Sequence, residues 1–175
     1  MPSDKPIAIV GFMGCGKTAV AQMVAADLER PMADLDDLVI ERHGRTPAEI
    51  ISIDGESAFR SIETNLLGQL LKSGFVGVLS LGGGAWIESA TRKLLAENAA
   101  LTIWLDTPFD VCWQRIEAAE EIRPLAPTRE QAKLLFDQRC QIYSLAKIHL
   151  KCSTNESLES VALRIKDAIQ KSDTL

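Results

Sequence analysis

An octapeptide near the amino terminus restricts the possible folds more than any other feature of the sequence. Residues 11–18 read Gly-Phe-Met-Gly-Cys-Gly-Lys-Thr and fit the pattern G-x-x-x-x-G-K-[ST]. A short β-branched run, Ile7–Val10, comes before it, and apolar residues recur at helical spacing from Lys17 to Glu29 after it. A glycine-rich loop between a strand and a helix can wrap its backbone N–H groups around phosphate oxygens. The sequence therefore predicts a loop that binds nucleotide phosphates.

The last two residues of this octapeptide supply side chains suited to phosphate chemistry. Lys17 is expected to reach the β and γ phosphates of a nucleotide, and Thr18 to offer its hydroxyl oxygen to Mg²⁺. The alternative is a glycine-rich turn with an incidental lysine, but the flanking strand and helix favour the phosphate loop. Such a loop does not by itself separate a switch, a motor and a kinase.

Further strand-length apolar runs alternate with helical patterns along the chain. They lie at Val76–Leu79 and Leu101–Leu105, with a weaker run at Ile148–Leu150 and a short one at Pro31–Ala33. Strands that alternate with helices favour a parallel sheet covered on both faces. We therefore expect an α/β fold.

Two segments interrupt this alternation. Residues 34–73 have a helical pattern with a helix start at Thr46-Pro47, and they predict an inserted helical subdomain. Residues 117–128 combine clustered charge with prolines and predict a mobile loop. The amphipathic segment Ser157–Ile169 predicts a closing helix.

Composition limits the number of domains and the classes of partner. With 175 residues, 46% of them hydrophobic, the chain suits one domain over residues 1–175. Its formal net charge of −5 argues against a nucleic-acid backbone or an anionic membrane surface as partner. Four scattered cysteines suggest neither a zinc site nor a disulfide framework, and they favour reduced thiols in the cytosol. We expect neither a signal peptide nor a membrane span.

Two motifs outside the phosphate loop could contact substrate. Asp34-Leu35-Asp36 follows a short predicted strand, so one carboxylate could organise magnesium and the other accept a hydroxyl proton. A solvated turn or a helix cap is the alternative for these residues. The turn Leu81-Gly82-Gly83-Gly84 follows another strand, where parallel sheets place ligands and glycines allow close approach. A flexible strand-to-helix connection is the alternative for that turn.

Three arginines could form a local cationic cluster in this acidic chain. Arg60 lies in the predicted insertion, Arg123 in the predicted loop and Arg139 on a predicted helix. Each alone is more often a solvated surface charge. Together they could grip a carboxylate and a transferring phosphoryl group, because guanidinium forks bind both groups bidentately.

The ordered set of these motifs resembles the shikimate kinase family over about residues 7–155. The resemblance rests on the octapeptide at 11–18, Asp34-Leu35-Asp36, Asp54-Gly55-Glu56 with Phe59-Arg60, Leu81-Gly82-Gly83-Gly84, Arg123-Pro124-Leu125, and Arg139 with Tyr143. It implies a three-layer P-loop kinase fold with about five parallel strands. It also implies that residues 34–73 form a substrate-binding insertion and residues 117–128 a lid.

The resemblance implies a specific reaction. A member of this family phosphorylates the 3-hydroxyl of shikimate with ATP, giving shikimate 3-phosphate and ADP in aromatic amino-acid biosynthesis. ATP as co-substrate and Mg²⁺ are the implied cofactors. We expect a cytoplasmic protein that is a monomer and binds neither nucleic acid nor membrane.

The resemblance also implies roles for individual residues. Asp36 would contact the substrate hydroxyls and could act as base, Arg60 and Arg139 would clamp the carboxylate, and Gly82, Gly83 and Gly84 would line the same cavity. Thr18 and Asp34 would hold Mg²⁺, while Lys17, Asp36 and the lid residue Arg123 would be the catalytic groups. The implied nucleotide-binding residues are Gly14, Cys15, Gly16, Lys17, Thr18, Ala19, Arg115 and Arg123, with residues 153–155 near the adenine.

Two other functions stay open on the sequence. One is a P-loop kinase with another small acceptor, such as gluconate or a nucleoside monophosphate, and acceptor screening separates it. The other is a catalytically silent nucleotide-binding regulator. The presence of Lys17, Asp36 and the three arginines argues against a silent protein, since such a protein has no physical need for them all.

Overall fold

The structure is a computed structural model that describes residues 5–119 and 124–172. Within these ranges a parallel sheet has the strand order β2-β3-β1-β4-β5. Its strands are β1 Ile7–Val10, β2 Met32–Asp34, β3 Val78–Ser80, β4 Leu101–Asp106 and β5 Ile148–Lys151. The predicted parallel sheet of about five strands is thereby confirmed.

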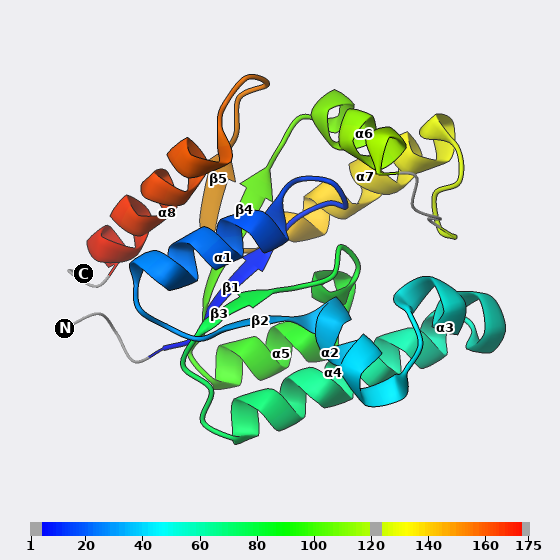
Figure 1. The fold of residues 1–175 in the computed structure, drawn as a ribbon, viewed down its shortest axis with the longest axis horizontal. Helices are drawn as coiled ribbons and strands as arrows, with labels where there is room; N and C mark the ends of the chain where they lie inside the picture. Colours follow the sequence, from blue (N-terminus) through cyan, green and yellow to red (C-terminus); the bar gives the residue numbers. More distant parts are fainter. Residues whose placement is uncertain (1–4, 120–123, 173–175) are drawn as a thin grey trace.

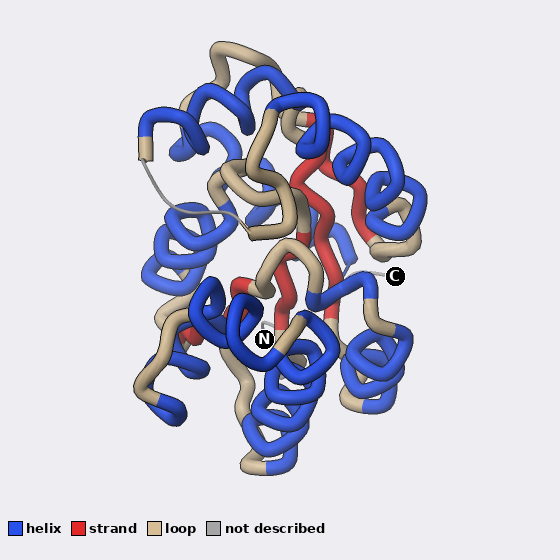
Figure 2. The backbone as a smooth tube through the Cα atoms, turned by 90° about the vertical axis from the view of Figure 1, so that its right-hand side faces the viewer, coloured by secondary structure: helices blue, strands red, loops and turns tan. Residues whose placement is uncertain are grey.

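Helices connect the strands and cover both faces of the sheet (Figure 1). They are α1 Lys17–Asp27, α2 Leu35–His43, α3 Pro47–Asp54, α4 Glu56–Lys72, α5 Ser89–Glu97, α6 Phe109–Ala118, α7 Arg129–Tyr143 and α8 Leu158–Ser172, with a short 3₁₀ helix, η1, at Ala85–Ile87. Helices α1 and α8 pack together on one face, and α4 and α5 pack together on the other. Figure 2 shows the twisted strands enclosed between these two layers. None of these helices, within the residues described, has the length and apolar character needed to cross a membrane.

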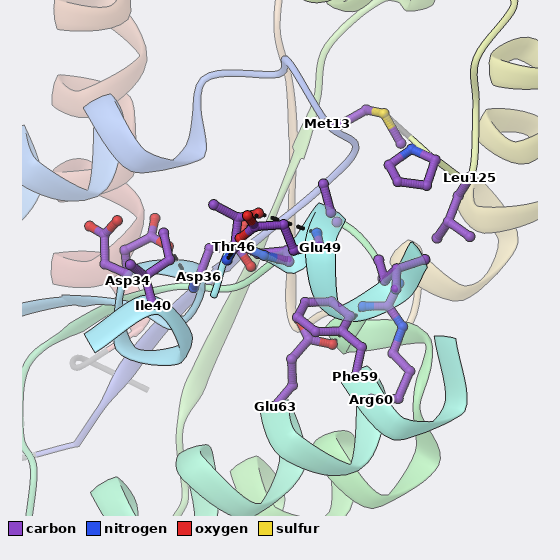
Figure 3. Close-up of a pocket in the computed structure, with 18 of the residues that line it drawn as sticks. Met13, Asp34, Asp36, Ile40, Thr46, Glu49, Phe59, Arg60, Glu63 and Leu125 are labelled. Atoms are coloured by element: carbon purple, nitrogen blue, oxygen red, sulfur yellow. Dashed lines mark hydrogen bonds and ion pairs between the residues drawn. The ribbon is translucent and has the colours of Figure 1, made fainter. Parts of the chain in front are cut away.

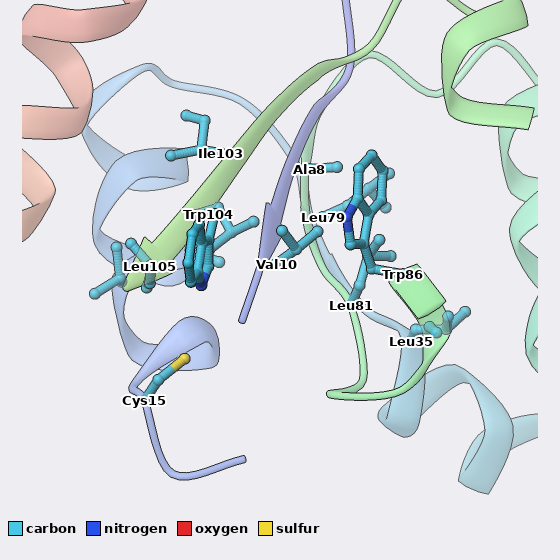
Figure 4. Close-up of a cluster of buried hydrophobic side chains, with 14 of the residues drawn as sticks. Ala8, Val10, Cys15, Leu35, Leu79, Leu81, Trp86, Ile103, Trp104 and Leu105 are labelled. Carbon is cyan, nitrogen blue, oxygen red and sulfur yellow. The ribbon is translucent and has the colours of Figure 1, made fainter. Parts of the chain in front are cut away.

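The core is built on the central strands. All four residues of β1 are buried, as expected for a strand covered on both faces. Side chains of β3 and β4 pack beside it, and Trp86 of η1 and Leu35 of α2 extend the same cluster (Figure 4). This core holds the carboxyl ends of β1, β2 and β3 at one edge of the sheet.

Several element boundaries differ from those predicted, each by one or two residues. Helix α1 ends at Asp27, because Glu29 adopts a left-handed conformation with φ of 53°. Strand β3 begins at Val78 rather than at position 76, and β2 lies one residue later than expected. Helix α6 continues to Ala118, so the segment predicted to be irregular from position 117 begins inside a helix.

Helices α2, α3 and α4 occupy the stretch between β2 and β3. The predicted start at Thr46-Pro47 is confirmed, since Thr46 and Glu49 form a capping box and proline occupies the first turn of α3. Asp34 caps α2 by accepting a hydrogen bond from the backbone N–H of Asp36. These caps fix where α2 and α3 begin, and both capping residues line the same cavity.

Candidate active site

A cavity of about 670 Å³ opens at the carboxyl ends of the parallel strands. This is the edge where open α/β sheets bind ligands. The lining residues are Met13, Thr18, Asp34, Asp36, Asp37, Ile40, Thr46, Pro47, Ala48, Glu49, Ile51, Phe59, Arg60, Glu63, Gly82, Gly83, Gly84, Pro124, Leu125 and Arg139. Figure 3 shows Phe59, Arg60 and Glu63 rising from α4, with Met13 and Leu125 across the cavity from Asp34 and Asp36. One wall is thus apolar and another carries charges of both signs.

The phosphate loop is packed tightly against α6. Gly14 has a φ of 73°, and a Cβ on it would lie 2.6 Å from the carbonyl oxygen of Cys112. Arg115, also on α6, donates to the Gly14 carbonyl oxygen at 3.2 Å. Lys17 Nζ donates to the Phe12 carbonyl oxygen at 2.8 Å, which keeps the ammonium group at the loop. The position of Gly14 therefore admits no side chain.

Three oxygen-bearing side chains meet where the phosphate loop enters α1. Thr18 Oγ1 donates to Asp34 Oδ2 at 2.7 Å and lies 3.3 Å from Ser80 Oγ. The other oxygen of Asp34 accepts from the backbone N–H of Asp36 at 2.9 Å. Asp34 is therefore a helix cap, as one sequence-based alternative held, and a partner of Thr18 as well. Ser80 was missed, although its place at the end of a strand before three glycines could have indicated it.

Arg60 is a buried cation held by two glutamates of its own helix. Its Nη1 forms an ion pair with Glu63 Oε2 at 2.5 Å, and its Nε and Nη2 donate to Glu56 Oε1 at 3.3 and 3.1 Å. Burial alone would lower the pKa of Arg60, but the charges and hydrogen bonds of Glu63 and Glu56 raise it above its ordinary value. Arg60 is therefore a permanent, fixed positive charge at the cavity.

Glu63 was not identified from the sequence, although it follows Arg60 by three positions on a helix, where side chains meet. Its side chain is 1% exposed. Its Oε1 has no hydrogen-bond partner among the residues that the structure describes. Burial raises the pKa of Glu63 to about 7; the Arg60 charge opposes this rise, and the Asp36 charge adds to it. A carboxyl group with a free oxygen therefore faces the cavity and titrates near neutrality.

The three glycines after β3 lie against the charged side chains of the cavity. A Cβ on Gly82 would lie 2.7 Å from Glu63 Oε1 and 2.9 Å from Asp36 Oδ1. A Cβ on Gly84 would overlap the guanidinium of Arg60. Gly83 lies beside Arg139, and its carbonyl oxygen accepts a hydrogen bond from the Tyr143 hydroxyl. The turn is therefore a close-packed floor and more than a flexible connection.

The structure brings most of the predicted site residues together. Asp34, Asp36, Arg60, Arg139 and the three glycines line one cavity with Thr18. Arg115 donates to the phosphate loop at Gly14, and Ala19 lies in the first turn of α1. The side chain of Cys15 is buried, and its Sγ accepts a hydrogen bond from Lys17 Nζ at 3.7 Å within the loop. Arg123, which was predicted to belong to a lid, lies outside the described residues.

Comparison with known proteins gives a consistent result. The family model described as shikimate kinase matches residues 13–170. A shikimate kinase of Cereibacter sphaeroides is 36% identical over 168 residues, which cover 94% of this chain and 82% of that protein. A solved structure described as shikimate kinase from Acinetobacter baumannii in complex with shikimate has a TM-score of 0.88 at 28% identity, covering 96% of this chain and 94% of that one. A solved structure described as shikimate kinase from Aquifex aeolicus has a TM-score of 0.79 at 30% identity, covering 97% of this chain and 98% of that one.

The parallel sheet, the phosphate loop and the adjoining charged cavity define a P-loop kinase of small molecules. The family match over most of the chain makes the assignment specific. This chain belongs to the shikimate kinase family. The resemblance seen in the sequence is confirmed, and with it the expectation of an ATP-dependent enzyme of the shikimate pathway.

Proposed function

We propose that this chain transfers the γ-phosphoryl group of ATP to the 3-hydroxyl of shikimate, giving shikimate 3-phosphate and ADP. The observation that carries the proposal is one cavity that joins the entry of the phosphate loop to two buried arginines, Arg60 and Arg139. Such a cavity accommodates two anions. The phosphate chain of ATP binds at the phosphate loop, and the carboxylate of the acceptor binds at the arginines. The family match supports shikimate as the acceptor.

Arg60 and Arg139 hold the acceptor carboxylate in this proposal. Guanidinium has five N–H donors, and three of those on Arg60 already bond to Glu56 and Glu63. The remaining two lie one on each terminal nitrogen, which matches the two oxygens of a carboxylate. Because the glutamates fix the guanidinium, little side-chain entropy is lost when the acceptor binds.

Asp36 accepts a hydrogen bond from the acceptor hydroxyl in this proposal. Its carboxylate lies above Gly82, which has no side chain to obstruct the ring of the acceptor. A carboxylate at this place can orient the hydroxyl for in-line attack, and it can take the proton as the new bond forms. The apolar side chains of Ile51, Phe59 and Leu125 offer a surface for the carbon ring.

The phosphate loop and Lys17 bind the ATP phosphates, with Gly14, Cys15, Gly16, Thr18 and Ala19 supplying backbone N–H groups. The donors near the loop suit Mg²⁺, since Thr18 and Asp34 offer only hard oxygen atoms. When bound there, Mg²⁺ would neutralise charge on the phosphate oxygens. In the chain itself, Lys17 stabilises the negative charge of the transferring group, and most of the catalysis is positioning and electrostatics.

Residues 117–128 act as a lid in this proposal, with Arg123 reaching the phosphates on closure. The support is the sequence resemblance and the place of Pro124 and Leu125, which border the cavity just after Arg123. Closure on the acceptor would exclude water, which competes for the phosphoryl group. Arg115 encloses the adenine together with residues 153–155.

The proposal extends to the organisation of the whole protein. Residues 1–175 form one domain in which residues 34–73 are the substrate-binding insertion. The four cysteines carry free thiols, as suits a cytoplasmic protein. We further propose a monomer that binds small molecules and neither nucleic acid nor membrane.

The test is ADP release by the purified protein with ATP and Mg²⁺. Shikimate is compared with gluconate, with nucleoside monophosphates and with no acceptor. Strong stimulation by shikimate alone is expected. Equal stimulation by another acceptor would overturn the assigned substrate, and bound ATP with no stimulation by any acceptor would indicate a regulatory protein.

A further inference from the structure

The connection between β5 and α8 is held at both of its ends. At one end, the backbone N–H of Cys152 donates to the Asp106 carbonyl oxygen at 3.0 Å and continues the pairing of β5 with β4. At the other end, the backbone N–H of Glu156 donates to the Ser153 carbonyl oxygen at 3.2 Å and closes a turn of residues 153–156. Because the strands are parallel, this turn lies at the same edge of the sheet as the phosphate loop (Figure 1).

The carboxylate of Glu156 attaches this turn to α8. Its Oε2 accepts from the backbone N–H of Ser153 at 3.0 Å, and its Oε1 accepts from the Ser160 hydroxyl at 3.1 Å. Arg164 Nη1 donates to both carboxylate oxygens, at 2.8 and 2.9 Å. The Glu156 side chain is 10% exposed. One largely buried carboxylate therefore joins the first residue of the turn to two residues of the helix.

The same contacts keep the Glu156 carboxylate ionised. The hydrogen bonds from Arg164 and from the backbone N–H of Ser153 hold the pKa of Glu156 below its usual value. An ionised carboxylate only accepts hydrogen bonds, and each of its partners here can donate. All of these bonds can therefore form together at neutral pH, and the turn keeps its attachment to α8.

Leu158, the first residue of α8, connects this turn to the phosphate loop. A Cβ on Gly16 would lie 2.9 Å from Leu158 Cδ2 and 3.3 Å from Arg115 Nη1. The start of α8 and the side chain of Arg115 therefore meet the phosphate loop at one glycine. A nucleotide whose phosphates bind at this loop has its base within reach of Arg115 and of residues 153–155.

We propose that Glu156 is a positioning residue for the base of ATP, because its carboxylate fixes the turn of residues 153–156 on which the adenine lies. The proposal rests on the adenine site given above to Arg115 and residues 153–155. Glu156 itself contacts neither the phosphates nor the acceptor in this proposal. A turn that is fixed before the nucleotide arrives loses little conformational entropy on binding. Loss of Glu156 should therefore weaken binding of the base and leave binding of the phosphates as it is.

The first experiment is Glu156→Ala, which removes the hydrogen bonds from Ser153, Ser160 and Arg164 together. The dissociation constant for ADP, measured by calorimetry without an acceptor, is expected to rise about fivefold or more, because binding must then order the turn. The KM for ATP should rise in parallel, and kcat at saturating ATP should not fall. An unchanged affinity for ADP would overturn the proposal.

Inorganic tripolyphosphate separates the contribution of the base from that of the phosphates. It carries a phosphate chain and no base, so its inhibition constant against ATP should be the same in Glu156→Ala and in the unsubstituted protein. An equal loss of affinity for ADP and for tripolyphosphate would show that Glu156 acts on the phosphate loop. That result would also overturn the proposal.

Two changes on α8 are matched controls. Ser160→Ala removes one donor to Glu156 and leaves the hydrogen bond from the Ser153 N–H. Lys166→Met removes the ion pair with Asp27 at 3.0 Å, which joins α8 to α1 away from the turn. Both variants should bind ADP as the unsubstituted protein does. If either weakens ADP binding as much as Glu156→Ala, Glu156 has only a structural role in α8.

A change in the turn itself separates failure of this inference from failure of the adenine site. Thr154→Gly combined with Asn155→Gly keeps Glu156 and makes the turn flexible, so it should also weaken ADP binding. If this double variant binds ADP normally, the base does not lie on the turn and the adenine site is wrong. If it weakens ADP binding and Glu156→Ala does not, only the role of Glu156 is wrong. Because ADP binding is measured without an acceptor, an error in the choice of shikimate would not change these results.

Discussion

The guanidinium of Arg60 lies directly against the backbone of Gly84, in space that a β-carbon would need. The two residues come from α4 and from the turn after β3. Gly84 has a φ of −105°, which any residue can adopt, so the requirement for glycine here comes from this contact alone.

Gly84→Ala is therefore expected to displace Arg60 and weaken acceptor binding. The KM for shikimate should rise by about tenfold or more, and the KM for ATP should change little. Steady-state kinetics with each substrate varied in turn measures both values. Gly68→Ala is the control, because Gly68 lies on the same helix as Arg60 and a Cβ added to it would lie 3.6 Å from its nearest neighbour. That variant should bind shikimate normally, and an equal effect of both changes would refute the specific contact.

Glu63→Gln should alter the pH dependence of stability. The pKa of Glu63 is raised from 4.5 to about 7, so the folded state holds this proton more tightly than the unfolded state. The contribution of this proton to the free energy of unfolding is fully present below pH 4.5 and is lost as the pH rises through about 7. Between these two pH values the free energy of unfolding of the unsubstituted protein falls by about 3 kcal/mol from this group. Glutamine does not titrate, so the free energy of unfolding of the variant should lack this pH-dependent contribution.

Urea unfolding of both proteins at pH 5 and pH 8 measures this component as the difference in their pH dependence. A parallel pH dependence of the two unfolding free energies would show that Glu63 does not titrate in this range. Glu88→Gln, a change of the same kind at a position whose side chain is more exposed, should leave the pH dependence as it is.

Thr18→Val should impair the use of Mg²⁺. Valine keeps the shape of threonine and removes the hydroxyl that donates to Asp34. We expect kcat to fall by about 10²-fold or more, and the Mg²⁺ concentration for half-maximal activity to rise. A titration of activity with MgCl₂ checks both effects. Thr18→Ser retains the hydroxyl and should behave almost as the unsubstituted protein, and a normal Mg²⁺ response in the valine variant would remove Thr18 from the metal site.

Asp36→Asn tests proton abstraction. The amide can orient a hydroxyl but cannot take its proton, so a base role predicts a fall in kcat of about 10² to 10⁴-fold. Single-turnover measurements separate the transfer step from product release. Near-normal kcat would show that Asp36 orients the hydroxyl and that the proton leaves late, as a loose transition state allows. Asp37→Asn, a neighbouring change on the same helix, serves as the control.

Arg123→Ala should lower kcat more than it weakens shikimate binding. The proposed lid arginine meets the phosphates as negative charge builds up on the transferring group, so its loss acts on the transition state. Comparison of kcat with the dissociation constant for shikimate, measured by calorimetry, checks this prediction. Unchanged kcat would refute the lid role.

Much of the fold and of the site could be predicted because local patterns determine them. The phosphate loop combines a strand, glycines and a helix within a few residues, and Thr46-Pro47 has the chemistry of a helix start. Ser80 has a local signal, its place at the end of a strand before three glycines, but the sequence does not show that it meets Thr18 and Asp34. The role of Glu63 arises from burial and from neighbours distant in sequence. A glutamate three positions after an arginine is common on solvated helices. Only the packed structure shows that Glu63 is enclosed and shares a cavity with Asp36.

Gly82, Gly83 and Gly84 also show that contacts between distant elements cannot be predicted from local sequence. From the sequence these glycines could equally have formed a flexible connection, because glycine is frequent in such turns. The structure distinguishes them, since each faces a different charged or aromatic side chain. Contacts of this kind depend on the tertiary arrangement of α4 and α7.

The carboxylate of Asp34 holds Thr18 with one oxygen and the backbone N–H of Asp36 with the other. A change in the angle of that carboxylate on one side therefore disturbs the bond on the other. Thr18 belongs to the donor's half of the proposed reaction and Asp36 to the acceptor's half. The two halves of the proposed reaction therefore meet at one carboxylate, and a rotation of the Asp34 side chain that breaks one of these hydrogen bonds also displaces the other.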